Sequence, residues 1–598
     1  MKKNKDYKGE VFFNFLKICL LIFLFLRPYF DGFSHTSFNH ISSLVLFIIF
    51  IISIIMMRKN LVFSPSQVAF FLFIGICGFL LFLWPTWYRS AREISYLFGL
   101  VTIWVVFKMV FDEKDFPSIT VALFSMLAVI IIYGIDQYFG GLEMTKQYIM
   151  QHPELIRNMS DTYLQRMASN RIFSRFVYPN TFAGYLLILY PVVLFSIFYY
   201  KKPLTRVVCG ILLALILPVF AATESMGGWF CFVIVSVLIL LYLIVPKRFY
   251  FYWCFALLIV CSIFVYMGIQ IGFLPKIGSL ADRINYWISA TNIFRKNPVY
   301  GIGPGNFSQF HLMFKVPGAM EAKFAHNIIF EIAACTGIVG IVFFLATGIF
   351  FILRNLRNFL YSDNLLLTGF IFGVIGFFLH CLVDFDYANP AITAIAFAFL
   401  GIIESVPDKH DISSAGLTKF FAGGMIIAGV LASTVEIKTL QVDKIIENIK
   451  AGEYRQENPI QVLEQASRIY PEPELFFIEG EIFVSAFEAT SSLELANMAI
   501  TSYEKAIKLN PDSSKYHRAL ARILVKLNRN EEAEKEFLEA IKNYPTKALY
   551  NLELGLFYRK IGEEQKAKIY LEKARDLPAS SVDEAEIIKK EIKNGEDF

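Results

Sequence analysis

The residues best suited to chemistry lie in one polar segment between two apolar runs. Arg283 stands four residues before Trp287, Gly301 and Gly303 punctuate the turn NPVYGIGPG, and His326 stands directly before an apolar run. A fixed cation, a turn whose backbone can approach a ligand closely and an imidazole at a helix start can together bind an anion. The pattern predicts a site that fits a diphosphate.

Other polar residues stand where apolar runs begin or end. Arg175 and Asn180 precede one such run, Asn327 opens the run after His326, and Asp384 follows another. Each has an ordinary alternative: an arginine beside a membrane helix often reaches toward the interface, and a residue at a helix end often caps it. Within the runs, we interpret His380 as structural and Glu331 as a support of the site or a buried partner.

Taken together, these motifs resemble the O-antigen ligase and O-antigen polymerase superfamily. The resemblance runs from about residue 138 to residue 390. The motifs that carry it are Arg283 before an aromatic residue, the N-P-x-x-G-x-G turn, the pair His326-Asn327, the start Pro179-Asn180 with Ala183, and the late H-x-x-x-D element from His380 to Asp384.

The resemblance implies transfer of a glycan from an undecaprenyl-diphosphate carrier to an acceptor hydroxyl at the outer face, without metal, nucleotide or other cofactor. His326 and Arg283 are the expected catalytic residues: Arg283 neutralises the diphosphate and His326 takes the acceptor proton. Direct displacement would invert the anomeric centre. The expected substrate-binding residues are Arg175, Asn180, Trp287, Gly301, Gly303, Asn327 and Asp384.

The sequence departs from the family pattern at one turn. Many members carry Ser-Arg-Gly-Ala there, but this chain has Ser225-Met226-Gly227-Gly228, so an arginine that the family often places on the lipid diphosphate is missing. Arg175, or another arginine of the same loop such as Arg171, is the candidate substitute.

The elements that must position these residues are membrane helices. Of the 598 residues, 56% are hydrophobic and 18% are charged, and mean hydropathy is +0.52, whereas soluble chains carry about 25% charged residues. Lysine and arginine punctuate the apolar runs instead of clustering on one face, which argues against nucleic acid as a partner. The eight cysteines form no CxxC pair, so we expect neither disulfides nor a metal site.

Thirteen apolar runs are candidate spans, since a bilayer core needs roughly 20 apolar residues per helix. Their approximate bounds are 11–26, 41–57, 67–84, 94–111, 118–137, 181–199, 205–221, 227–245, 249–271, 327–353, 365–383, 391–403 and 417–434. With the basic N-terminus inside, the positive-inside rule puts basic loops in the cytoplasm and the long loops 138–180 and 272–326 outside. Arg89 and Arg92 are exceptions. The site residues then share the outer side.

The last part of the chain has a different character. It is rich in glutamate and lysine, and its small alanines and large apolar residues repeat every 34 residues, with prolines that close the units. These positions are Ala499, Ala533 and Ala567; Tyr503, Phe537 and Leu571; and Pro511, Pro545 and Pro578. The period resembles tetratricopeptide (TPR) repeats, which form concave surfaces that bind protein partners.

The expected fold is therefore all-α: a polytopic transmembrane bundle of 12 to 13 helices, GT-C-like, over residues 1–434, and a TPR-like α-solenoid over 435–598. We expect a multi-pass protein of the bacterial cytoplasmic membrane, with the N-terminus inside and the repeats outside. Its partners would be the lipid-linked glycan, a lipid, glycan or protein acceptor, and proteins that bind the repeats. A ligase, a polymerase and a protein O-oligosaccharyltransferase stay open, as do a transporter and a non-enzymatic scaffold for polysaccharide assembly.

Overall fold

The computed structural model describes residues 2–30, 36–56, 61–84, 86–152, 169–271, 278–412, 414–451 and 458–596. Parts of both predicted long loops, residues 153–168 and 272–277, lie outside the described residues. Helices dominate the described chain, which also contains an isolated β-bridge between Phe63 and Ile412. The predicted all-α fold class is confirmed.

Within the described residues, each of the thirteen predicted apolar runs overlaps a helix, and the ends differ by a few residues. In the part of the chain that the structure describes, ten helical stretches are long and apolar enough to cross a membrane, and three shorter apolar helices, Val11–Leu26, Leu365–Cys381 and Pro390–Glu404, accompany them. The helices are α1 (Lys2–Leu26), α2 (Thr36–Met56), α3 (Pro65–Leu80), α4 (Trp87–Val110), α5 (Phe116–Asp136), α9 (Pro179–Tyr199), α10 (Pro203–Ala222), α11 (Met226–Ile244), α12 (Tyr250–Gln270), α15 (Ile328–Tyr361), α16 (Leu365–Cys381), α17 (Pro390–Glu404) and α18 (Ala415–Ala451).

Polar caps and prolines fix where these helices begin. Asn327, Asn364 and Asn389 each accept backbone N–H bonds at the starts of α15, α16 and α17, where amide donors have no partner within the helix. Proline occupies the first position of α3, α9, α10 and α17, where its missing N–H costs nothing.

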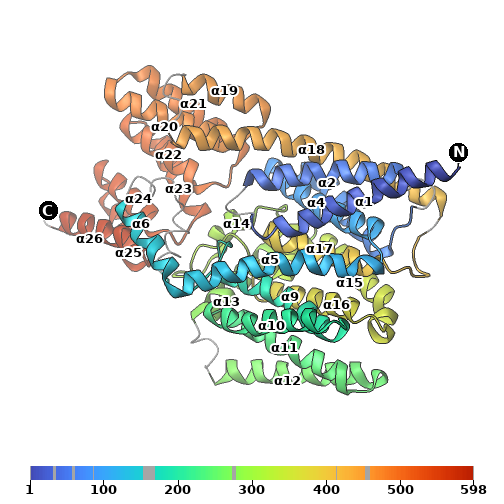
Figure 1. Cartoon of the computed structure of the whole chain (residues 1–598). Coiled ribbons are helices and arrows are strands. Elements are labelled where there is room, and N and C mark those ends of the chain that lie inside the picture. Colours follow the sequence, from blue (N-terminus) through green and yellow to red (C-terminus); the bar gives the residue numbers. More distant parts are fainter. Residues whose placement is uncertain are drawn as a thin grey trace.

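Helix α9 forms the buried centre of the bundle, packed against α16 and α10. Glycines let α16 approach it: a Cβ on Gly373 would lie 2.5 Å from the Ile188 carbonyl oxygen, and one on Gly369 would lie 3.0 Å from Val192 Cα. Small residues at helix contacts are the usual device for close packing inside a membrane. In Figure 1 the apolar helices lie side by side along one direction.

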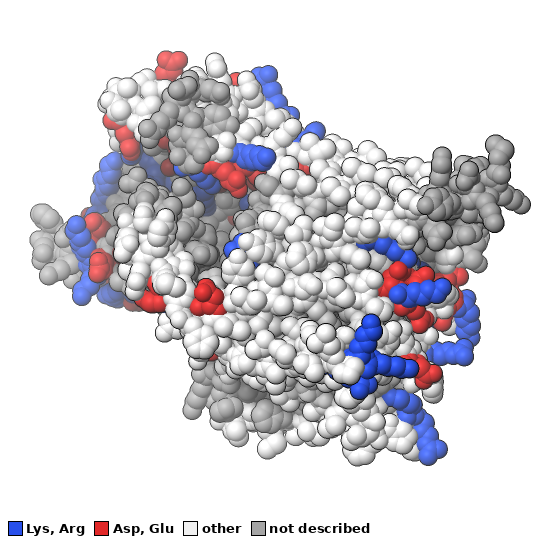
Figure 2. All heavy atoms as spheres, in the orientation of Figure 1, with Lys and Arg blue, Asp and Glu red and all other residues white. Residues whose placement is uncertain are grey.

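Figure 2 shows how charge is distributed over this bundle. Lysine, arginine, aspartate and glutamate gather at the two ends of the helices and over the C-terminal region, and the middle of this face carries few of them. Such an uncharged belt is what contact with hydrocarbon requires, because charged side chains are costly there.

Helix α15 is broken near its start. Gly337 has non-helical angles (φ 63°, ψ −162°), and the turn that contains Gly301 fills the break. The amides of Ile302 and Gly303 donate to the carbonyls of Ala334 and Cys335, at 3.1 and 2.8 Å. The glycine turn thus satisfies carbonyl groups that the broken helix leaves without partners.

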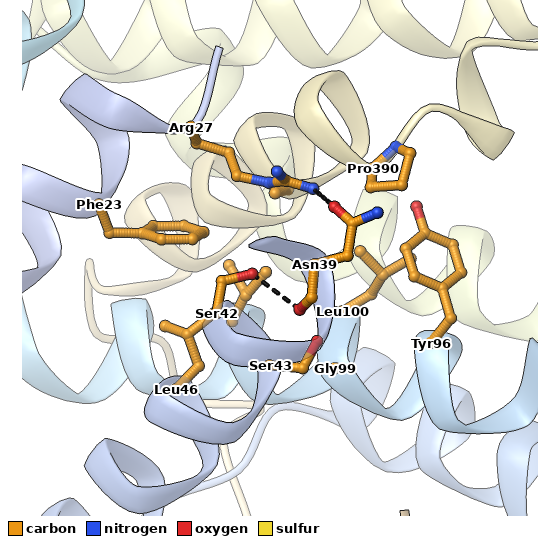
Figure 3. A pocket seen from close by; sticks show the side chains of 12 residues that line it. Phe23, Arg27, Asn39, Ser42, Ser43, Leu46, Tyr96, Gly99, Leu100 and Pro390 are labelled. Atoms are coloured by element: carbon orange, nitrogen blue, oxygen red, sulfur yellow. Dashed lines mark hydrogen bonds between the residues drawn. The ribbon is translucent and has the colours of Figure 1, made fainter. Parts of the chain in front are cut away.

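A small cavity of about 30 Å³ lies among α1, α2, α4 and α17, which is room for about one water molecule. Figure 3 shows Arg27 reaching across it: Nη2 donates to Asn39 Oδ1 at 2.6 Å, and Ser42 Oγ donates to the Asn39 carbonyl at 2.9 Å. Tyr96 and Pro390 also line it. These contacts tie α1 to α2 close to the start of α17.

The C-terminal part is a stack of helix pairs, which confirms the predicted solenoid. It comprises α19 (Pro459–Ile469), α20 (Pro473–Thr490), α21 (Leu493–Leu509), α22 (Ser514–Lys526), α23 (Asn530–Asn543), α24 (Ala548–Lys560), α25 (Glu564–Asp576) and α26 (Val582–Glu596). The alanines of the 34-residue repeat are buried where helices meet. Helix α18 runs along the bundle and continues toward α19 (Figure 1), so one helix crosses the predicted domain boundary at 434/435, which stays a prediction.

Candidate active site

A buried carboxylate, Asp384, forms the centre of the site. Its side chain is 1% exposed, and its Oδ2 accepts hydrogen bonds from Arg283 Nη2 at 2.7 Å and from Asn180 Nδ2 at 2.8 Å. Its Oδ1 accepts the Phe385 amide at 2.9 Å and lies 3.3 Å from His326 Nδ1. Asp384 therefore joins four chain segments that are far apart in sequence.

Electrostatics keep Asp384 ionised. Burial alone would raise its pKa, but the His326 ring, the Arg283 guanidinium and the His380 ring hold the pKa of this carboxyl well below its ordinary value. A carboxylate surrounded by cationic and donor groups in a low-dielectric site behaves in this way.

His326 is held in an uncommon backbone conformation, with φ 53°. Its ring lies between Tyr286, at a centroid distance of 5.2 Å, and Phe385, at 4.6 Å. The amide of the preceding residue, Ala325, donates to Glu331 Oε2 at 2.7 Å. The His326 side chain is 21% exposed, and Asp384 faces its Nδ1 atom.

Arg283 lies on α13 (Gly278–Lys296), with its side chain 10% exposed. Besides the bond to Asp384, its Nη1 donates to the Ser279 carbonyl at 3.2 Å, and its Nε is buried with no hydrogen-bond partner in the described chain. A buried guanidinium with an unused donor can accept a further anionic ligand.

A second arginine, Arg171, reaches the same cluster from the loop before α9. Its Nη2 donates to Asn180 Oδ1 at 2.6 Å, and its Nε donates to the Thr223 carbonyl at 2.8 Å. Burial lowers the pKa of Arg171, and the charges of Glu224 and Asp384 oppose that effect. Arg171 thus stands beside the turn where Met226 replaces the family arginine, and of the two candidate substitutes it is the one bonded into the Asp384 cluster.

Two of the predicted binding residues, Asn180 and Asn327, hold the site together. Asn180, near the start of α9, bridges Arg171 and Asp384. Asn327 caps α15 and donates from Nδ2 to the Leu382 carbonyl at 2.7 Å, which ties the His326 segment to the Asp384 loop. Binding of substrate by these side chains stays a prediction.

The predicted glycines pack against protein backbone. Gly301 and Gly303 have positive φ, of 66° and 91°. A Cβ on Gly301 would lie 2.3 Å from the Cys335 carbonyl carbon, and one on Gly303 would lie 2.5 Å from Ser90 Oγ. Their conformations and their close approach explain why glycine occupies both positions, and a contact of this turn with ligand stays a prediction.

Arg175 and Trp287 make other contacts. The Arg175 guanidinium lies over the rings of Tyr29, at 4.2 Å, and Tyr133, at 5.4 Å, which accounts for its position through cation–π attraction. The Trp287 ring stacks on Phe330 at 5.6 Å, and its Nε1 is buried with no hydrogen-bond partner in the described chain.

His380 and Asp386 lie beside this cluster but were not among the predicted site residues. His380 is fully buried, and its Nδ1 lies 2.5 Å from Asp386 Oδ2. Gly184 of α9 makes room for that carboxylate, since a Cβ there would lie 1.9 Å from Asp386 Oδ2. A histidine six residues before an aspartate was the available signal, but its interpretation as structural left it out of the site.

The repeats contact the segment that leads to His326. Gln309 on α14 (Phe307–Phe314) exchanges two amide bonds with Asn510, at 2.7 and 2.9 Å. Tyr544 donates to Glu321 at 2.6 Å and accepts from Lys315 at 3.2 Å. The repeat region is therefore fastened to the chain between the glycine turn and the site.

Comparison with known families agrees with this arrangement. Residues 211–345 match the family described as O-antigen ligase. Residues 498–548 and 518–581 match the tetratricopeptide repeat family. A comparison with curated proteins found no match.

Solved structures similar to the chain include TPR proteins. A crystal structure of MamA is 23% identical, with a TM-score of 0.17, and the match covers 19% of this chain and 64% of that one. MamA AMB-1 is 18% identical, with a TM-score of 0.20, and the match covers 26% of this chain and 86% of that chain. YrrB, a TPR protein with an unusual peptide-binding site, is 20% identical, with a TM-score of 0.20, and the match covers 30% of this chain and 86% of that chain. These values are too low to carry an argument.

Fold and site together define a multi-pass membrane protein with an arginine, a histidine and an aspartate joined at one end of its helical bundle. Its matches to the O-antigen ligase family and, further along the chain, to tetratricopeptide repeats agree with the resemblances that the sequence motifs predicted. Its function is accordingly related to surface polysaccharide at a membrane.

Proposed function

We propose that the protein transfers a glycan from an undecaprenyl-diphosphate carrier to an acceptor hydroxyl on the outer face of the bacterial cytoplasmic membrane. The observation that supports this most strongly is that one buried carboxylate, Asp384, contacts both Arg283 and His326. One residue thereby sets the distance between an anion-binding group and a base.

In this mechanism the acceptor oxygen forms a bond to the anomeric carbon while the bond from that carbon to the diphosphate breaks. The acceptor proton moves to Nε2 of His326, and the electron pair of the broken bond leaves with the lipid diphosphate. Asp384 faces Nδ1, so it favours the tautomer whose Nε2 is free to accept a proton and stabilises the imidazolium that forms.

Arg283 would bind the diphosphate through donors that Asp384 and Ser279 do not occupy. Arg171 adds a second positive charge through Asn180. Two guanidinium groups provide charge stabilisation of the leaving group of the kind that many glycosyltransferases obtain from a metal ion. We therefore propose transfer without a metal.

The test is glycan transfer by purified protein in EDTA, with an undecaprenyl-diphosphate-linked glycan and a panel of acceptors. We expect wild type to transfer, and His326→Ala to lose about 10²- to 10⁴-fold in rate, since this is the usual contribution of a general base. Arg283→Ala should lose about 10²- to 10³-fold. His410→Ala is the matched control, because that histidine is 53% exposed and pairs only with Asp408 among the described residues.

The acceptor that becomes labelled identifies the reaction. Transfer of the glycan to a lipid-linked saccharide acceptor indicates a ligase. Extension of the glycan itself indicates a polymerase, and transfer to a protein hydroxyl indicates a protein O-oligosaccharyltransferase. Folded variants that transfer as fast as wild type would refute the assignment of the site, and a wild type that transfers to no acceptor would refute the function.

A further inference from the structure

His326 is held in its uncommon backbone conformation by an anchor on each side. Its φ of 53° lies in the left-handed region, which is costly for a residue with a Cβ and persists only where the surroundings enforce it. After His326, Asn327 donates from Nδ2 to the Leu382 carbonyl at 2.7 Å. Before it, the Ala325 amide donates to Glu331 Oε2, also at 2.7 Å. The chain is therefore anchored one residue before and one residue after His326.

Glu331 also contacts the loop that carries Asp384. The hydroxyl group of Tyr387, three residues after Asp384, donates to the same Oε2 atom of Glu331 at 3.2 Å. One carboxylate oxygen thus accepts hydrogen bonds from the two segments that meet in the 3.3 Å contact between His326 Nδ1 and Asp384 Oδ1. Supporting hydrogen bonds of this kind fix the separation of groups that must react together.

Glu331 acts as an acceptor in each of its described hydrogen bonds. Besides the amide and the phenol, the Cys335 thiol donates to Oε1 at 3.6 Å, one turn further along α15. The carboxamide oxygen of glutamine can accept the same amide and hydroxyl bonds from the same distance along the side chain. These contacts therefore require an acceptor oxygen at this place, and a negative charge is not needed for them.

We infer that Glu331 is a positioning residue for the transfer reaction, and this rests on the proposed function. Its carboxylate holds the segment of His326 against the loop of Asp384, so that the ring is oriented to take the acceptor proton. Glu331 acts through the Ala325 amide and the Tyr387 hydroxyl. Its loss should reduce the rate of the chemical step and leave the binding of both substrates unchanged.

Two substitutions separate the position of the acceptor oxygen from its charge. Glu331→Gln keeps the length of the side chain and removes the charge, whereas Glu331→Asp keeps the charge and withdraws the carboxylate by one methylene group. We expect Glu331→Gln to retain most of the wild-type kcat. Glu331→Asp should lose about 10- to 100-fold in kcat, because a misplacement of about 1 Å can cost about 10²-fold. The KM values for donor and acceptor should not change.

A double-mutant cycle with Asp384→Asn tests whether Glu331 acts through the contact between His326 and Asp384. Substitutions within one network have non-additive effects, whereas independent effects add. In the Asp384→Asn background, where that contact is already altered, Glu331→Asp should lower kcat far less than in wild type. A purely structural role of Glu331 predicts the same factor in both backgrounds.

Glu404→Asp is the matched control for loss of stability. Glu404 is 0% exposed and accepts hydrogen bonds from Ser64 and Ser66, at 2.7 and 2.5 Å, so withdrawing its carboxylate should lower the melting temperature. It ends α17 (Pro390–Glu404), about 20 Å along the helix from the Asp384 loop. Its kcat should therefore stay at the wild-type value.

Three results would overturn the positioning role: a loss of kcat in Glu331→Gln as large as in Glu331→Asp, wild-type kcat in Glu331→Asp, or additive losses in the cycle. If Glu331→Asp fails to fold, Tyr387→Phe removes one donor to Glu331 and should lower kcat in wild type but not in Asp384→Asn; equal effects would overturn the role.

If wild type transfers no glycan, the proposed function fails, and a cryo-EM structure of Glu331→Asp tests the positioning role by itself. The distance from His326 Nδ1 to Asp384 Oδ1 should then exceed 3.3 Å. An unchanged distance together with an unchanged positive φ at His326 would overturn the role.

Discussion

Replacing Asp384 by asparagine should remove the charge that the site is built around while preserving its shape. The carboxylate accepts Arg283 and Asn180 on one oxygen, and it accepts the Phe385 amide and faces His326 on the other. A carboxamide has one acceptor oxygen and one NH₂ group. If its oxygen retains Arg283 and Asn180, its NH₂ group faces His326 Nδ1.

The consequence follows from the tautomer of His326. An NH₂ group opposite Nδ1 requires Nδ1 to accept, so the proton moves to Nε2 and the ring can no longer take a proton there. We expect Asp384→Asn to lower the transfer rate about 10²- to 10⁴-fold, which corresponds to about 3 to 5 kcal/mol in activation free energy.

The assay is the rate of glycan transfer at saturating donor, with size-exclusion elution and thermal unfolding as checks on folding. Asp443→Asn is the matched control, because Asp443 also pairs with an arginine, Arg92, at 3.0 Å but is 28% exposed. A folded Asp384→Asn that retains more than about a tenth of wild-type activity would refute the role given to Asp384.

Three further predictions concern the structure around the site. Gly301→Ala should destabilise the fold well beyond the roughly 1 to 2 kcal/mol of left-handed backbone strain, because its Cβ would collide with backbone at 2.3 Å. Gly305→Ala is the control, since its backbone strain is similar but the nearest atom to its Cβ is 3.5 Å away. Equal melting temperatures of the two variants would contradict the predicted collision. Burial lowers the pKa of His311 to about 4, so between pH 4 and pH 6.5 the folded state binds fewer protons than the unfolded state. The free energy of unfolding should therefore fall as the pH falls from 6.5 toward 4. In melting experiments at several pH values, His311→Gln should not show this decrease in stability. Tyr544→Phe removes the 2.6 Å bond to Glu321 and should speed proteolytic release of the repeats, and an unchanged cleavage rate would show that this bond does not hold them.

The helices were predictable because their signal is local. Lipid contact requires apolar runs, and thirteen of them are visible in the sequence. Pairing of helices requires small residues, and alanines spaced by 34 residues provide them. The break in α15 at Gly337 was not predictable in this way, because it depends on hydrogen bonds from Ile302 and Gly303. From apolar composition alone, one continuous membrane-spanning helix is predicted at this place.

The site was predictable in its types but not in its pairing. Arg283, His326 and Asp384 stand out in sequence, yet the contacts among these three join residues up to 101 positions apart. Arg171 was only one of two candidate substitutes for the missing family arginine, and the structure bonds it to Asn180. His380 looked structural because a histidine in an apolar run usually is, and its contact with Asp386 becomes visible only in three dimensions.

The central claim is a direct displacement in which His326 deprotonates the acceptor while Arg283 holds the leaving diphosphate. The most direct test is the anomeric configuration of the newly formed glycosidic bond, determined by NMR on the product of a single transfer from a donor of known configuration. Inversion relative to the donor linkage is the predicted result. Retention would contradict direct in-line displacement by the acceptor.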